Sequence, residues 1–349
     1  MPSIPQPAKP TASSWAVLAA LRWFLASIVM MLHLEDTFVP SNSWSHFIVS
    51  FGGKAAVMGF FLISGYSIAH SYGERPDGYF RRRFLRIYPL YCVAVLFTQF
   101  VVFITPSPAV CLNGYAYVSA GFLTSVANLL LLQQFIAIPL TYNIPLWTLS
   151  IEVFYYLLAP FLYRRPQIAI ALLVVASMIA FQFPLTNPPL YGYLVLVFFW
   201  PWLIGFLVGQ NQGRPTLPVI LGLIGGVLVF ISDKETPEPL SVVTYLVTFG
   251  AILTAPRFNL PKLVQKIANL LGDLSYPLYL FHLPLMIFFF KHFGVRGYPA
   301  FLTCVIGSTA LLWYVFDEKL KRWFWIPLVD GVIRFLRTKW LNWAPQTSE

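Results

Sequence analysis

Charged side chains are scarce in this chain. Asp, Glu, Lys and Arg together make up 10% of its 349 residues, while 58% of the residues are hydrophobic. Soluble globular domains carry about 25% charged residues, so this composition excludes an ordinary soluble fold. No stretch of the sequence is both long enough and polar enough to form a separate soluble domain. The composition therefore predicts a polytopic membrane protein.

Cysteine and acidic residues are also rare. Cys92, Cys111 and Cys304 have no metal-type spacing, and two of them fall within apolar runs. The sequence therefore predicts neither a disulfide framework nor a metal site. Basic residues outnumber acidic residues, 23 to 13. In a soluble protein this excess could indicate nucleic-acid binding, but its distribution along this chain indicates membrane topology, and we expect no nucleic-acid partner.

Ten apolar runs predict an all-α bundle of about ten transmembrane helices, because a helix needs roughly 17–25 apolar residues to cross a bilayer. These runs are 15–34, 47–70, 87–105, 145–163, 167–184, 190–210, 216–232, 239–255, 274–292 and 298–317. Most basic residues fall between runs on one predicted side, and the outer loops hold only Lys234, Lys291 and Arg296. This asymmetry predicts that both termini are cytoplasmic. We expect a multi-pass protein of a bacterial inner membrane.

Three regions follow from this pattern. Residues 1–14 are rich in Pro and Ser and lack the features of a secretory signal, which predicts a disordered cytoplasmic tail. Residues 15–320 form the transmembrane domain. Residues 321–349 mix tryptophan with basic residues, which predicts an amphipathic cytoplasmic tail at the membrane interface. The uncharged outer stretch 106–142 predicts a lid or re-entrant segment packed over the bundle.

Two ionisable residues, Arg22 and His33, lie inside the first apolar run. Eleven residues at ~100° each place both side chains within ~20° of one helix face, separated by ~16 Å along the axis. Ionisable groups are costly in hydrocarbon and usually line an internal cavity. The first helix is therefore a candidate catalytic or transport element.

Further polar residues occur at comparable depths. Glu152 lies about two turns inside the fourth run, His282 near the middle of the ninth, and Lys54 enters the second from the outer side. A cluster of arginines marks the opposite, inner mouth: Arg81, Arg82, Arg83 and Arg86. Each group has a structural explanation of its own, such as a buried ion pair, an interhelical hydrogen bond or a contact with lipid phosphate. Their occurrence together favours a functional site.

Five motifs in succession resemble the signatures of the membrane-bound acyltransferase 3 family, and they occur in the family's order. They are Leu21-Arg22 followed by His33, Gly59-Phe-Phe-Leu-Ile-Ser-Gly65, Arg83-Phe-Leu-Arg86-Ile-Tyr-Pro89, Pro145-Leu-Trp-Thr-Leu-Ser-Ile-Glu152 and Ser275-Tyr-Pro-Leu-Tyr-Leu-Phe-His282. The resemblance covers roughly residues 20–285.

This resemblance implies a ten-helix O-acyltransferase. Such an enzyme moves an acyl group, commonly acetyl, from cytoplasmic acyl-CoA to a hydroxyl of a glycan or glycoconjugate, and we expect no fused soluble esterase domain. Acyl-CoA would be a co-substrate and no cofactor would be bound; the partners would be the donor, a carbohydrate or glycolipid acceptor, and membrane lipids. In the family the functional marks are the pairs that correspond here to Arg22 with His33 and to Arg83 with Arg86.

A mechanism can be stated for these residues. Arg83 and Arg86 would bind the phosphates of the donor, and Arg22 would hold the thioester arm or polarise its carbonyl. His33 would remove the proton of the acceptor hydroxyl, with Glu152 orienting the imidazole. Direct transfer and an acyl-histidine intermediate are both compatible with the sequence. The remaining residues expected to line the site are His282, Ser275, Tyr276, Ser64 and Lys54.

A different class of function also fits the buried polar residues. A proton-coupled transporter or glycan exporter would use His33, Glu152 and His282 as a relay around a midplane site. The inverted repeat expected of such a transporter is not visible in the sequence, and transport gives no reason for the Arg83–Arg86 spacing. A function as a membrane scaffold or sensor would not explain why charged residues are buried within the apolar runs.

Overall fold

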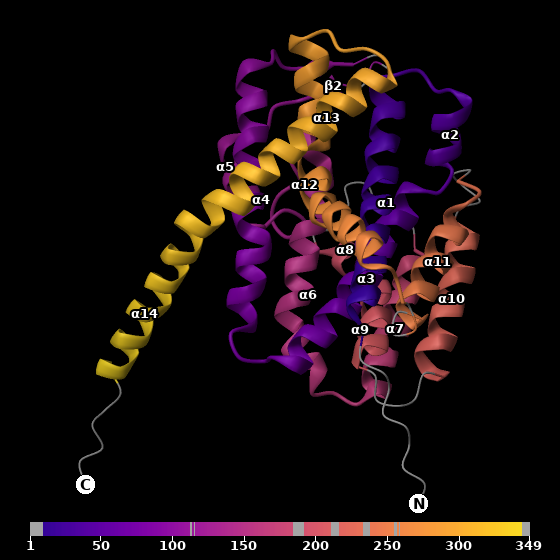
Figure 1. Cartoon of the computed structure of the whole chain (residues 1–349), viewed down its shortest axis with the longest axis vertical. Coiled ribbons are helices and arrows are strands. Elements are labelled where there is room, and N and C mark those ends of the chain that lie inside the picture. The colour runs from indigo at the N-terminus through magenta and orange to yellow at the C-terminus, as the bar shows by residue number, and fades with distance from the viewer. Residues whose placement is uncertain are drawn as a thin grey trace, which may run out of the picture.

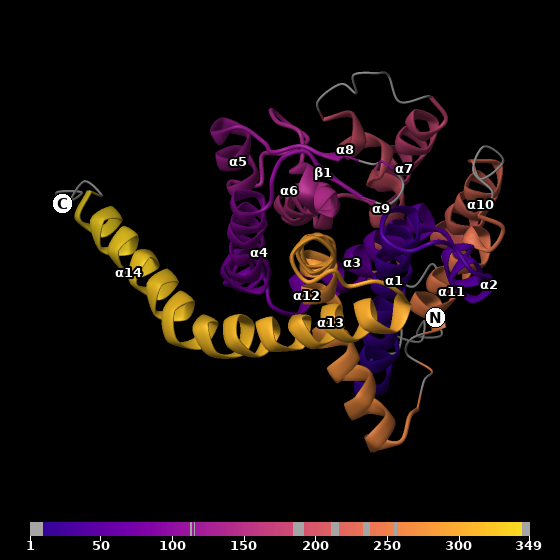
Figure 2. The same cartoon turned by 90° about the horizontal axis from the view of Figure 1, so that it is seen from above.

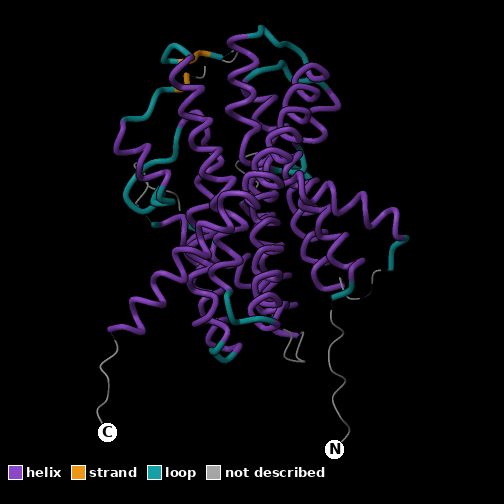
Figure 3. The backbone as a smooth tube through the Cα atoms, turned by 60° about the vertical axis from the view of Figure 1, so that its left-hand side comes forward, coloured by secondary structure: helices purple, strands orange, loops and turns teal. Residues whose placement is uncertain are grey.

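The computed structural model describes residues 10–111, 114, 116–183, 192–210, 216–232, 238–254, 257 and 259–343. The predicted all-α class is confirmed for these residues. Their only strands are β1 (Ala109–Val110) and β2 (Ala116–Tyr117), a short antiparallel pair. Most helices run along the long axis of the molecule, and the strands lie at one end of it (Figure 3). The first helix begins at Ala12, and residues 1–9 of the predicted tail lie outside the described residues.

Five described helical segments are long and apolar enough to cross a membrane. They are α1 (Ala12–Thr37), α4 (Tyr79–Ile104), η1 joined to α6 (Thr141–Tyr163), α12 (Lys262–His292) and a continuous helix, Tyr298–Leu336. The continuous helix comprises α13 (Tyr298–Leu312), η3 (Trp313–Trp325) and most of α14 (Ile326–Trp343). The multi-pass membrane character predicted from the composition follows from these helices.

A sixth crossing forms if α2 (Ser43–Val49) and α3 (Gly53–Glu74), bent by 43°, are counted as one span. Three shorter apolar helices are also present: α7 (Gln167–Phe181), α10 (Thr216–Ser232) and α11 (Ser241–Thr254). Every predicted apolar run overlaps a described helix. Five or six of the described helices meet the length criterion, so the count of ten crossings stays a prediction.

The helices divide into two groups around a centre made by α1, α3 and α12. Figure 1 shows α4, α5 (Phe122–Leu129) and α6 on one side, and α7, α10 and α11 on the other. Figure 2, seen from above, shows α14 diverging from the bundle. The bidentate pair of Arg81 with Asp330 in α14 ties this helix to the start of α4; its N–O distances are 2.7 and 2.9 Å.

The tightest helix crossing joins α3 to α9 (Phe199–Gln210). Gly65 and Gly205 allow it, because a Cβ at Gly65 would collide with the carbonyl oxygen of Trp202, and a Cβ at Gly205 with that of Leu62. Small residues permit such close backbone approach in membranes, where van der Waals packing drives association. The crossing holds α3, which carries a large share of the polar site, against the core.

We expect Gly65→Ala to lower the free energy of unfolding by about 1–3 kcal/mol or more, because backbone has to move to admit the methyl group. The midpoint of thermal unfolding in detergent measures the effect. Gly250→Ala in α11 is the matched control, since its Cβ would meet nothing within 4 Å and alanine favours a helix over glycine. Equal loss of stability in both variants would contradict this account of the crossing.

The uncharged stretch 106–142 packs on the bundle, as predicted. Asn128 and Gln133 are fully buried. The Gln133 amide donates to the Tyr91 hydroxyl and to the Leu146 carbonyl oxygen, both at 2.9 Å. These bonds connect the stretch to α4 and to η1 (Thr141–Leu146). The role of this stretch as a lid stays a prediction.

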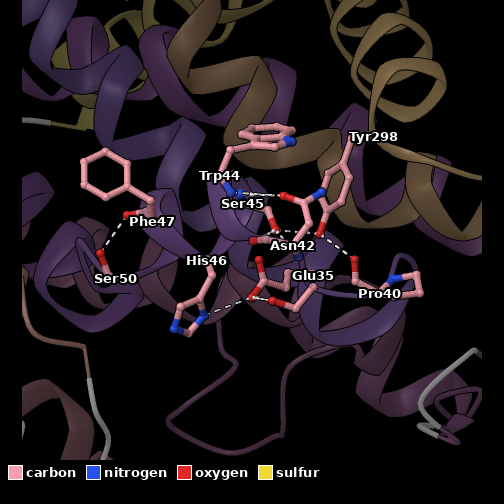
Figure 4. A network of polar contacts seen from close by, with 10 residues as sticks. Glu35, Pro40, Asn42, Trp44, Ser45, His46, Phe47, Ser50 and Tyr298 are labelled. Carbon is pink, nitrogen blue, oxygen red and sulfur yellow. Dashed lines mark hydrogen bonds and ion pairs between the residues drawn. The ribbon is translucent and has the colours of Figure 1, made fainter.

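A polar network fixes the connection between α1 and α2 (Figure 4). Glu35 is nearly buried, and its Oε1 lies 3.4 Å from Nδ1 of the exposed His46. The Tyr298 hydroxyl from α13 donates to the Pro40 carbonyl oxygen at 3.1 Å and lies 2.8 Å from Ser45 Oγ. The end of α1 that carries His33 is therefore held by α2 and α13.

Candidate active site

A cavity of about 730 Å³ lies among α1, α3, α4, α6, α12 and η3. Its lining from the first four of these helices is Trp15, Arg22, Val57, Phe60, Phe61, Ser64, Ser67, His70, Ser71, Glu74, Arg82, Arg83, Arg86, Ile87, Thr148, Leu149, Glu152 and Tyr156. Arg75 and the residues Gly272, Asp273, Ser275, Tyr276, Pro277, Tyr279, Trp313, Asp317, Glu318 and Lys321 complete it. Its charged lining comes mainly from α4, η3 and the α3–α4 connection, and Val57, Phe60, Phe61 and Leu149 supply apolar lining.

The arginines of α4 face the cavity because of helical spacing. Arg86 is four residues from Arg82 and three from Arg83, so all three lie toward one side of the helix, whereas Arg81 pairs with Asp330. Within the described residues, none of the three cavity arginines has a carboxylate within 4.0 Å. The Arg83 guanidinium donates to the Ser71 hydroxyl, and Arg86 is exposed. Guanidinium groups without counter-ions favour an anionic ligand here.

Arg22 lies deeper than the α4 arginines and is also short of partners. Its Nε is buried and has no hydrogen-bond partner. Asp273 and Glu152 attract its charge, while Arg86 repels it. Ser67 Oγ, on the α3 side of the cavity, is likewise buried and unpartnered. Buried polar groups are rarely left unsatisfied in native proteins, so these atoms are available to a ligand.

Glu152 is part of a cluster in the middle of the cavity. Its Oε1 accepts hydrogen bonds from the Ser64 hydroxyl at 2.7 Å and from the Tyr156 hydroxyl at 2.6 Å. No hydrogen bond or ion pair joins Glu152 to His33 in the part of the chain that the structure describes. The expected Glu152–His33 pairing is therefore replaced by a carboxylate that organises two hydroxyl groups and offsets the charge of Arg22.

The cavity mouth is of mixed charge. Lys321 pairs with Asp317 at 2.9 Å, and Glu318 pairs with Arg322 at 2.8 Å. These acidic residues come from η3, which the sequence placed at the end of the last span. The basic cluster predicted from the sequence thus applies to α4, whereas η3, which packs against α4 through Trp325, carries both signs.

His33 and His282 do not line the cavity, but they lie next to each other. Their rings are stacked, with centroids 5.4 Å apart and an interplanar angle of 26°. His282 is one helical turn beyond Tyr279, a lining residue at the apolar end, and the two rings are 6.1 Å apart. The Tyr279 ring packs edge-on against Phe60 at 5.4 Å. Tyr279 therefore contacts both a second cavity-lining ring and the ring of His282.

The structure brings most of the predicted site residues together. Seven of them line the cavity: Arg22, Ser64, Arg83, Arg86, Glu152, Ser275 and Tyr276. Lys54 is placed elsewhere, because it is exposed and its Nζ lies 4.7 Å from the centroid of the Phe181 ring on α7. A lysine near the end of a helix extends its stem along an apolar surface and keeps its charge near water. The position of Lys54 in the sequence therefore predicted a deeper location for its charge than the structure shows.

Sequence reasoning missed several lining residues. On α3, Ser67 and Ser71 follow the predicted Ser64 at helical spacing, and His70 and Glu74 also line the cavity. A polar stripe of this kind in an apolar helix could have been recognised from the sequence as a candidate cavity lining. The aromatic lining residues carried no such signal, because aromatic residues are abundant throughout this chain.

The site combines guanidinium groups, which favour an anionic ligand, with apolar and hydroxyl-bearing side chains such as Phe60, Thr148 and Tyr279. In the described part of the chain, no group of three or more His, Cys, Asp or Glu residues could hold a metal ion. The residues of the cavity can stabilise charge, form hydrogen bonds and transfer protons.

Comparison with known proteins gives the family. A family model described as an acyltransferase domain, that of the acyltransferase 3 family, matches residues 15–318. Acyltransferase MdmB of Streptomyces mycarofaciens is 34% identical over 155 residues, which are 42% of this chain and 38% of the relative. The putative acetyltransferase ORF330 of Acidianus two-tailed virus is 28% identical over 231 residues, 59% of this chain and 64% of the relative.

The matched region spans less than two thirds of the length of each relative. No solved structure matches the chain. The family model nevertheless covers the helices that form the cavity, the arginine motif and both histidines. The chain therefore belongs to the acyltransferase 3 family.

Proposed function

We propose that this protein is a membrane O-acyltransferase that moves an acyl group, acetyl in the simplest case, from cytoplasmic acyl-CoA to a hydroxyl of a glycan or glycoconjugate. The observation that carries the proposal is a single cavity with arginines that lack counter-ions at one end and a histidine pair one helical turn beyond the other. The relatives named as an acyltransferase and a putative acetyltransferase support the same class of reaction.

The donor would bind from the α4 side. The phosphates of acyl-CoA would lie against Arg83 and Arg86, where charge-assisted hydrogen bonds are strong. The pantetheine arm would run along the serine stripe of α3, with Ser67 and Arg22 offering unpartnered hydrogen-bonding atoms. Acyl-CoA acts as a co-substrate in this scheme, and no resident cofactor is required.

Transfer would take place where the cavity meets the histidine pair. The acceptor oxygen attacks the thioester carbonyl carbon, the new C–O bond forms and the C–S bond breaks. The hydroxyl proton passes to the His33 imidazole and then to the departing thiolate, so that the free thiol of CoA leaves. An acyl-histidine intermediate is the two-step alternative. In either route the thioester has to pass the cavity-lining ring of Tyr279, which lies 6.1 Å from the His282 ring.

The membrane arrangement belongs to the same proposal. With α4 arginines facing the cytoplasm, the donor binds inside and the acceptor approaches from the α2 and 106–142 side. Ten crossings with both termini cytoplasmic, in a bacterial inner membrane, fit the distribution of basic residues. The start of α1 and the end of α14 lie toward the same end of the molecule, which is consistent with an even number of crossings (Figure 1).

Incubating the detergent-purified protein with radiolabelled acetyl-CoA tests the proposal. We expect acetyl-CoA to raise the midpoint of thermal unfolding, because a ligand that binds only the folded state stabilises it. We also expect native membranes containing the protein to incorporate label into a carbohydrate or lipid fraction. A protein that neither binds, hydrolyses nor transfers acetyl-CoA, but moves a glycan across vesicles, would be a transporter instead.

A further inference from the structure

We propose that His282 is the acceptor-binding partner of His33: its Nε2 accepts a hydrogen bond from a second hydroxyl of the glycan acceptor, next to the one that reacts, and so holds the reacting hydroxyl beside the His33 ring. This inference rests on the proposed function and adds a positioning residue to it. His282 comes from α12, so the site for the acceptor would be built between two helices that are far apart in the sequence.

The hydrogen bonds of His282 fix which of its nitrogens is free. Nδ1 lies 3.0 Å from the carbonyl oxygens of both Leu278 and Tyr279 on its own helix. A carbonyl oxygen can only accept, so Nδ1 carries the proton. In the neutral ring Nε2 is then a hydrogen-bond acceptor with a free lone pair. The backbone of α12 thus performs the orienting role that a carboxylate performs in many catalytic histidines.

That free acceptor atom has no partner. His282 is 0% exposed, and its Nε2 is buried without a hydrogen bond. Leaving a buried polar atom unsatisfied costs about 1–3 kcal/mol. A purely structural histidine would be expected to use both nitrogens for interhelical hydrogen bonds. An oriented lone pair kept free beside a second imidazole is instead suited to a ligand that brings a hydroxyl group.

The position of His282 connects it with the cavity. At ~100° per residue, Ser275, Tyr279 and His282 lie within ~60° on one face of α12, and the first two line the cavity. On α1, Arg22 and His33 likewise share a face, and Arg22 lines the cavity. Both histidines therefore continue the cavity-facing stripes of their helices, at the same end.

The stacking of the two rings also favours a shared ligand. With planes only 26° apart, the nitrogen lone pairs point along the ring planes, and the rings cannot hydrogen-bond to each other. Each can still offer a nitrogen to a molecule at the edge of the pair. His282 Nε2 would accept a hydrogen bond from one hydroxyl of the acceptor while His33 takes the proton of the neighbouring hydroxyl that reacts.

Three substitutions separate this role from a structural one. In His282→Asn the amide N–H can replace the Nδ1–H bond to the helix carbonyls, but nothing replaces Nε2. In His282→Gln the amide oxygen can reach the Nε2 position. His282→Met matches Gln in length and has no strong acceptor. We measure transfer from radiolabelled acetyl-CoA in native membranes, and thermal stabilisation of each purified variant by acetyl-CoA.

We expect transfer to fall by about 10-fold or more in His282→Asn, with acetyl-CoA stabilisation retained, and to recover partly in His282→Gln. Wild-type transfer in a folded Asn variant would overturn the inference. If His282→Asn does not fold, the comparison of His282→Gln with His282→Met is decisive. Higher transfer activity in His282→Gln supports the role of Nε2, and equal activity in the two variants overturns it. Wild-type protein that neither binds acetyl-CoA nor transfers label would instead disprove the proposed function, which keeps the two failures distinct.

Discussion

Substitution of His33 by alanine is expected to lower acyl transfer by about 10²–10⁴-fold, the usual contribution of a general base, and to leave acetyl-CoA binding unchanged. The physical reason is that His33 would supply the base but does not line the cavity, whereas the donor charges would be bound by the α4 arginines, which do line it. Transfer of label in membranes and thermal stabilisation of the purified variant by acetyl-CoA measure the two effects separately.

His46→Ala is the matched control. His46 is also a histidine near the outer end of α1, but its side chain is 68% exposed and its ring contacts Glu35 rather than the cavity. We expect transfer in this variant to stay within about 2-fold of wild type, as for most exposed positions. If folded His33→Ala retains near wild-type turnover, or if both variants lose activity equally, His33 is not the base.

Removal of the α4 guanidinium groups is expected to act on the donor. Arg83→Ala and Arg86→Ala should each weaken acetyl-CoA binding by about 10- to 100-fold, since a charged hydrogen bond contributes about 1.5–3 kcal/mol. The binding of acetyl-CoA should also weaken as salt concentration rises, because the charges of an exposed mouth are screened. Titration calorimetry of the purified protein at two salt concentrations measures both.

Arg81→Ala provides the matched control on the same helix. Arg81 adjoins the motif, but it is paired with Asp330 in α14 and lies off the cavity. Its removal should leave acetyl-CoA affinity unchanged and loosen only the attachment of α14. An equal loss of affinity in Arg81→Ala and Arg86→Ala, or a loss of acceptor use as large as the loss of donor use, would contradict a phosphate site on the cavity face of α4.

The positions of the helices followed from local properties of the sequence. Long apolar runs must be helical in lipid because every backbone polar group has to be satisfied within its own segment. The prediction therefore placed a helix at each run. It was less accurate about their lengths: α4 starts at Tyr79 and includes the whole arginine cluster, and α12 starts at Lys262. A helix continues past the apolar boundary where charged side chains can face a cavity or water.

The candidate site was predictable to the extent that it depends on single helices. Helical spacing alone put Arg22 and His33 on one face, and Arg83 and Arg86 on another. Partners across helices were not predictable in the same way. The carboxylate of Glu152 contacts Ser64 and Tyr156, although depth along the membrane suggested His33. Depth gives only the position of a side chain along the membrane normal. Whether two side chains on different helices touch also depends on the rotation of each helix about its axis.

The sequence by itself determined that this protein is an all-α membrane protein with ionisable residues on the inner faces of its helices, because hydropathy and helical period are local quantities. Only the tertiary structure decided which faces meet. It put Lys54 outside the cavity, stacked His282 on His33, and packed Phe60 against Tyr279 in the cavity wall. Those outcomes follow from close packing at crossings such as Gly65–Gly205, where side-chain shape fixes the rotation and spacing of the helices.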